Sequence, residues 1–149
     1  MKKLSGGCSC GAVRFAVTDY LYALMCHCDA CKKRTGSAYG LSVMIRNEDL
    51  SELTGETKTF VRRGESGRLV RYEFCPQCGT TVRWQIEIVP NRQVFALGAF
   101  DEPHLFEVVG EMYADEALLW ARLGCELVRS GAPDDPFRNA LIEKRRKLR

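Results

Sequence analysis

The fold is decided around one short segment, Phe74-Cys75-Pro76-Gln77-Cys78-Gly79-Thr80. A Cys-x-x-Cys turn directs two sulfur atoms and several backbone amides into one concavity. The glycine after the second cysteine permits the left-handed residue that completes such a turn. Two thiolates satisfy only half of a tetrahedral zinc ion, so the other ligands must come from elsewhere in the chain.

A second motif near the N-terminus, Cys8-Ser9-Cys10-Gly11, supplies two more sulfur atoms. Together the two motifs complete a four-cysteine zinc site that ties the N-terminal strand to a distant hairpin. Such a site is closed, and we expect it to be structural. Its predicted ligands are Cys8, Cys10, Cys75 and Cys78.

A third motif differs because it places three thiols within six residues, in Cys26-His27-Cys28-Asp29-Ala30-Cys31. Three protein ligands and an open position are typical of catalytic zinc. The sequence therefore predicts a second, catalytic zinc on Cys26, Cys28 and Cys31, and two zinc ions per chain. A purely structural site completed by His27, His104 or Cys125 is the competing interpretation.

Cations and hydroxyls follow this third motif directly. Zinc with three thiolates carries a net charge of −1, which the next three residues can offset, or they can hold an anionic substrate nearby. The turn after them adds hydroxyls and backbone donors. The predicted substrate-binding residues are Lys32, Lys33, Arg34 and Ser37.

The strands around these motifs are recognised by alternating apolar residues. The clearest case is residues 82–88, where Val82, Trp84, Ile86 and Ile88 alternate with polar side chains and predict a strand with one buried face. Further strands are expected in residues 13–17, 41–45, 59–62, 69–74 and 94–99.

Helical patterns are confined to the C-terminal part. Apolar residues at steps of three and four predict a helix over 115–128, and a second helix is expected to start at Pro136 after an Asp134 or Asp135 cap. Cys125 is then a small buried side chain on a helix face, and Trp84 and Trp120 are expected in the core. The basic residues at the C-terminus are interpreted as a solvated helix end.

Composition restricts the class of protein. The 149 residues are 46% hydrophobic and 28% charged, which fits a globular domain, and no window is apolar enough for a membrane span. The net charge of +3 does not indicate a polyanion partner, so nucleic-acid binding is not expected. The chain starts without a secretion signal, and we therefore expect a cytoplasmic protein whose eight cysteines hold metal rather than form disulfides.

The order and spacing of all three motifs resemble the family of the glutathione-dependent formaldehyde-activating enzyme (GFA) and centromere protein V. The matching stretches run from Gly6 to Arg14, from Cys26 to Ser37 and from Phe74 to Thr80. The resemblance implies a mainly β fold, a β-tent of antiparallel sheets around zinc sites, here with a C-terminal helical extension. It places a GFA-like zinc-binding domain in residues 1–122 and a helical basic extension in 123–149.

The resemblance also implies a carbon-sulfur lyase that adds a small-molecule thiol, glutathione or a similar one, to formaldehyde or another small aldehyde, as in S-hydroxymethylglutathione formation. Two features depart from the family pattern. Glu111 stands where the family usually has a His, and the usual short ending is replaced by the longer basic tail. The alternative function is a non-enzymatic zinc module that binds protein or nucleic acid.

Overall fold

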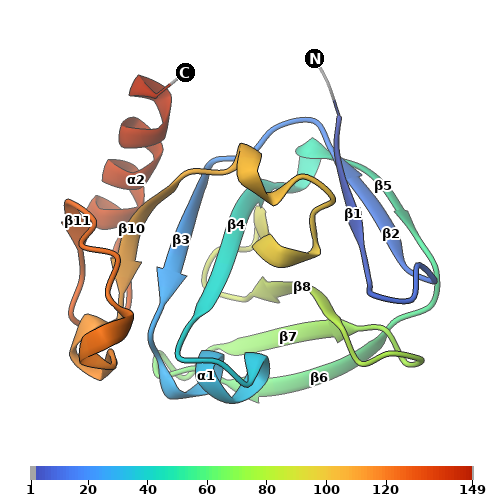
Figure 1. Cartoon of the computed structure of the whole chain (residues 1–149), viewed down its shortest axis with the longest axis horizontal. Helices are drawn as coiled ribbons and strands as arrows, with labels where there is room; N and C mark the ends of the chain where they lie inside the picture. Colours follow the sequence, from blue (N-terminus) through green and yellow to red (C-terminus); the bar gives the residue numbers. More distant parts are fainter. Residues whose placement is uncertain (1–2, 149) are drawn as a thin grey trace. The chain divides into compact units, whose positions relative to one another are not determined.

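The computed structural model describes residues 3–148 and divides them into two compact units. The first unit comprises residues 3–20 and 43–105, and the second comprises 21–42 and 106–148. The described residues are mainly β, with strands in two sheets and α-helices in the second unit (Figure 1). This confirms the predicted fold class, including the C-terminal helix.

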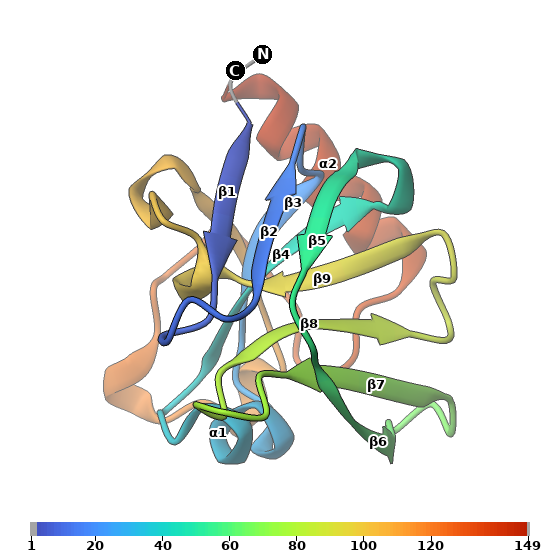
Figure 2. The same cartoon turned by 90° about the vertical axis from the view of Figure 1, so that its right-hand side faces the viewer.

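The first unit consists of antiparallel strands. One sheet has the strand order β1-β2-β5, and four further strands follow one another in the order β9-β8-β7-β6 (Figure 2). Short 3₁₀ turns connect some of them, and β4 (Gly40–Arg46) contributes residues to both units. The strand bounds are β1 Leu4–Gly7, β2 Arg14–Val17, β5 Leu50–Thr54, β6 Lys58–Arg63, β7 Leu69–Phe74, β8 Thr81–Ile86 and β9 Arg92–Ala96. The 3₁₀ turns are η1 Asn47–Asp49, η2 Leu97–Ala99 and η3 Pro103–Leu105.

Aromatic side chains fill the core of the first unit near the loop that carries Cys8 and Cys10. The ring of Phe15 packs 4.4 Å from that of Phe95 and 4.9 Å from that of Phe100, measured between centroids. A Cβ at Gly6 would lie 2.4 Å from both the Phe15 ring and the Ala99 carbonyl oxygen, so only glycine fits there. Close packing therefore fixes the strand that leads into Cys8.

The second unit holds strand β3 (Tyr22–Cys26), which is buried along its whole length and pairs in parallel with β10 (Val108–Met112). On its other side β10 pairs in parallel with the short strand β11 (Leu127–Val128). Figure 1 shows helix α2 (Asp135–Lys147) beside β10 and β11. The remaining elements are α1 Asp29–Thr35, η4 Ala114–Glu116 and η5 Leu119–Ala121.

Most predicted strands are confirmed, and β7 has the predicted bounds. The second helix is also confirmed, with Asp134 as its cap accepting the Phe137 N–H at 3.0 Å. No helix in residues 3–148 is long and apolar enough to cross a membrane. The division at residue 122 stays a prediction.

The helix predicted over 115–128 is wrong. These residues form η4, η5 and β11, because backbone groups of Tyr113 and Ala114 pair with residues 129–131 instead of forming helical bonds. Gly124, at φ 71°, has a left-handed conformation that an α-helix does not accommodate. The prediction that Trp120 lies in the core is also wrong, because its side chain is 78% exposed, whereas Trp84 is buried as expected.

Candidate metal centres

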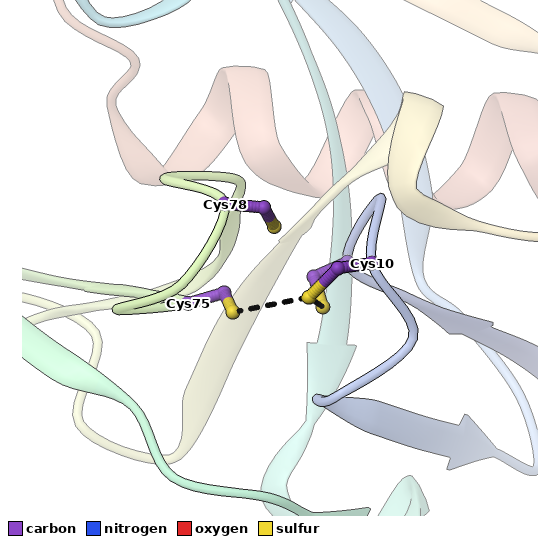
Figure 3. Close-up of side chains that lie close together, drawn as sticks. Cys10, Cys75 and Cys78 are labelled. Carbon is purple, nitrogen blue, oxygen red and sulfur yellow. Dashed lines mark hydrogen bonds between the residues drawn. The ribbon is translucent and has the colours of Figure 1, made fainter.

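The first cysteine group is formed by two loops of the first unit. Cys8 and Cys10 lie between β1 and β2, and Cys75 and Cys78 lie between β7 and β8. Backbone bonds close the second loop: the Cys75 N–H donates to the Thr80 carbonyl at 2.9 Å, and Gly79, at φ 74°, completes the turn. Figure 3 shows Cys75 and Cys78 pointing from this loop toward Cys10.

The sulfur positions of this group suit a tetrahedral ion. All four Sγ atoms lie within 4.8 Å of one another, with 3.5 Å between Cys8 and Cys10 and 3.7 Å between Cys10 and Cys75. Zinc–sulfur bonds of about 2.3 Å in a tetrahedron separate neighbouring sulfurs by about 3.8 Å. The group can therefore hold a zinc ion with small adjustments.

The thiols of this group differ in pKa because their sulfur atoms lie close together and have different hydrogen-bond donors. The Thr80 hydroxyl, 3.2 Å from the Cys78 sulfur, and the Thr80 N–H lower the pKa of Cys78 to about 5. The Ala12 N–H lowers the pKa of Cys10, but the neighbouring sulfurs outweigh it and raise that pKa to about 11. Four adjacent thiolates repel one another, and a bound cation removes that penalty.

The second cysteine group lies in the second unit, where β3 turns into α1. Cys26 ends the strand, Cys28 caps the helix and Cys31 lies in its first turn, and the three sulfurs are within 4.8 Å of one another. The Cys31 N–H donates to the Cys28 sulfur at 3.4 Å. Cys26 and Cys31 are buried and Cys28 is half-buried. This group can hold a metal with three protein ligands.

Arg34 supplies positive charge to the second group. Hydrogen bonds from Cys26 and Cys28, together with the charge of Arg34, lower the pKa of Cys31 to about 3. Hydrogen bonds with Cys28 and Cys31 raise the pKa of Cys26, and its burial raises that pKa further. A Cβ at Gly40 would lie 2.9 Å from Arg34 Nη2 and 3.4 Å from the Cys31 sulfur, so this glycine leaves room for the guanidinium beside the thiolate.

The other predicted substrate residues lie around α1. Lys32 Nζ donates to the Glu116 carbonyl at 2.9 Å, and Lys33 forms an exposed ion pair with Asp29 at 2.8 Å. Ser37 is exposed in the turn after the helix. Lys33 and Ser37 are therefore the more accessible of the four, and substrate binding by this set stays a prediction.

The sequence did not reveal a buried polar cluster behind the second group. His27 and Glu111 are both fully buried, and His27 Nε2 lies 2.7 Å from Glu111 Oε2. Glu111 also accepts from Arg122 Nε and from the Cys125 N–H, each at 3.1 Å. Burial raises the pKa of Glu111, but the bonds from His27, Cys125 and Arg122 lower it overall.

This cluster bears on the alternatives for a fourth ligand. Among residues 3–148, the histidines and Cys125 are absent from both groups of donor atoms close enough to share a metal. His27 bonds to Glu111 instead. The sequence shows that Glu111 replaces the usual histidine of the family. Its partner His27 lies 84 residues away, so the pairing of the two side chains could not be derived from motif spacing.

Comparisons with known proteins agree with this arrangement. A crystal structure of a Rhodobacter sphaeroides protein, a structural genomics target, is 23% identical and has a TM-score of 0.54, covering 70% of this chain and 97% of its own, which shows a shared fold. The search of curated proteins gives no match. The family described as glutathione-dependent formaldehyde-activating enzyme matches residues 3–116, which contain both cysteine groups. The chain therefore belongs to the glutathione-dependent formaldehyde-activating enzyme family.

Proposed function

We propose that the protein is a zinc-dependent carbon-sulfur lyase that adds a thiol, glutathione or a similar one, to formaldehyde or another small aldehyde. The observation that carries this proposal is the second cysteine group. Within residues 3–148 it brings together three sulfurs and no fourth donor, beside a cationic side chain. A zinc ion held there keeps a position for substrate.

In the proposed reaction the thiol sulfur forms a bond to the carbonyl carbon, and the thiol proton ends on the former carbonyl oxygen. Zinc, when bound, supplies Lewis acidity that favours a thiolate or polarises a carbonyl. Cys26, Cys28 and Cys31 would hold it, and Arg34 offsets their negative charge. Lys33 and Ser37 are exposed nearby on the same helix and turn, where they can bind the carboxylates of an anionic thiol.

The first group has a different proposed role. Cys8, Cys10, Cys75 and Cys78 would hold a second, structural zinc that joins two loops of the first unit. In the described structure all eight cysteines are free thiols. We infer a cytoplasmic location, because a reducing compartment keeps such ligands available.

A non-enzymatic zinc module that binds a protein is the second candidate. The observation in its favour is an exposed apolar segment, in which Leu119 is 96% and Trp120 78% exposed. The basic helix α2 gives less support to nucleic-acid binding, because several of its charges are paired within the chain, among them Lys144 with Glu126. If the protein is such a module, we expect it to bind a partner protein and to catalyse no thiol–aldehyde reaction.

The test is to count zinc and then to follow thiol–aldehyde exchange by NMR. We expect two zinc ions per chain, and faster interconversion of ¹³C-formaldehyde and its glutathione adduct than in buffer. Cys28→Ser should abolish the acceleration, whereas Cys125→Ser, outside both groups, should retain it. Exchange at the buffer rate across a panel of thiols and small aldehydes, with both zinc ions bound, would refute the lyase and favour the binding module.

A further inference from the structure

A chain of polar contacts, buried at His27 and Glu111 and 39% exposed at Arg122, connects the second cysteine group to the C-terminal part of the protein. It starts at His27, whose chain neighbours are Cys26 and Cys28, and passes to Glu111 at 2.7 Å and then to Arg122 at 3.1 Å. His27 and Glu111 are fully buried. His27 is also fixed through its backbone, because its N–H donates to the Met112 carbonyl at 3.1 Å.

The strand that carries Glu111 is itself held by C-terminal residues. Strand β11 pairs with β10 at Gly110 and Glu111, and the Arg129 N–H donates to the Glu111 carbonyl at 2.9 Å. Helix α2 packs against the same strand, since a Cβ at Gly110 would lie 2.4 Å from Leu141 Cδ2. Leu141 is fully buried. The backbone and the side chain of Glu111 are therefore both anchored from beyond residue 116, the last residue that the family pattern matches.

We propose that residues 117–148 form a clamp on the three-cysteine metal site, in which Arg122 is a positioning residue that acts through Glu111 and His27. This inference rests on the proposed function only in taking Cys26, Cys28 and Cys31 as metal ligands. The clamp lies outside the family match, so it distinguishes this chain from members of the family that end earlier.

The physical reason is the cost of removing a charged partner from a buried carboxylate. The Glu111 carboxylate accepts hydrogen bonds from His27, from Arg122 and from the Cys125 N–H, and Arg122→Met removes both the bond and the positive charge of the guanidinium. The carboxylate then gains by moving toward water, and it takes the His27 ring with it. Because His27 lies between two ligands, a change in its position alters the separation of their sulfurs. Loss of outer-sphere support commonly weakens metal binding by 10- to 100-fold, and we expect about tenfold here because Arg122 acts through two residues.

The experiment compares Arg122→Met with a matched control, Arg129→Met. Arg129 lies in the same clamp but pairs with Asp134 at 2.8 Å, so its side chain does not bond to Glu111. Each full-length protein is loaded with Co²⁺, and the thiolate-to-metal absorption is followed during titration with a chelator. The four-cysteine group serves as the reference in the same sample.

We expect Arg122→Met to release metal from the second group at about tenfold lower chelator concentration, with an altered Co²⁺ spectrum, while the first group and Arg129→Met behave as the wild type. Arg122→Lys, which keeps the charge, should recover part of the difference, and it serves as the test if the Met variant does not fold. Equal release from wild type and the Arg122 variants would overturn the clamp. A shift in release in a protein without lyase activity would support the clamp and refute only the proposed function.

Discussion

Replacing one ligand in each cysteine group should destabilise the protein to different extents. In Cys75→Ser the lost metal link joins segments far apart in sequence, since Cys10 and Cys75 are 65 residues apart. Closing a loop of that length in the unfolded chain corresponds to about 4 kcal/mol at 25 °C. Cys28→Ser opens a link that spans only residues 26–31, for which the same relation gives about 2 kcal/mol.

These amounts are large relative to the 5 to 15 kcal/mol that stabilises a typical domain. With a urea dependence of about 2 kcal/mol per molar, we expect the unfolding midpoint to fall by about 2 M in Cys75→Ser and about 1 M in Cys28→Ser. The measurement is equilibrium urea unfolding of zinc-loaded protein, followed by circular dichroism. Cys125→Ser is the matched control, because among the described residues Cys125 belongs to neither cysteine group. Its sulfur contacts the Val108 carbonyl at 3.7 Å, and the midpoint of this variant should stay near that of the wild type.

Equal midpoints for Cys75→Ser and Cys28→Ser would refute the division into a long-range structural link and a local site. A Cys75→Ser midpoint equal to that of Cys125→Ser would show that the first group contributes no stabilising metal. Removing zinc from the wild type with a chelator should lower its midpoint at least as far as Cys75→Ser does, since both links are then lost.

Three further predictions concern charges. Arg34→Gln should weaken metal retention by the second group about tenfold in a chelator titration, because the guanidinium lies beside Cys31. Lys33→Gln should leave the metal in place and raise the KM for glutathione by no more than about fivefold, with the rate for neutral mercaptoethanol unchanged. Hydrogen bonds from Arg14 lower the pKa of Asp101 below its usual value of 3.8. Because the pair is half-exposed, it contributes less than about 1 kcal/mol to the free energy of unfolding. This contribution is fully present above pH 3.8 and is lost as the pH falls through the lower pKa of the folded state. Asp101→Asn should therefore lower Tm slightly at pH 7 and leave it unchanged near pH 2, and an equal loss at both values would contradict this account.

The sequence predicted six of the strands and the cysteine motifs well because their signals are local. Alternation at Val82 and Trp84 needs only neighbouring residues, and a Cys-x-x-Cys turn followed by Gly79 specifies its own geometry. The C-terminal segment was predicted less well. Its apolar spacing suggested a helix, but the pairing of β11 with β10 and the left-handed Gly124 oppose one. Trp120 is exposed rather than in the core.

The sequence by itself determined the family, the mainly β class and the residues of both cysteine groups, because cysteine type and spacing carry that chemistry directly. Only the tertiary structure decided that His27 bonds to Glu111, and that Arg34 lies beside Cys31 while Lys33 pairs with Asp29. The physical reason is that a buried charge needs a partner but does not specify where in the sequence that partner lies. Packing of strands distant in sequence makes that choice, and it brought Glu111 to a histidine 84 residues away.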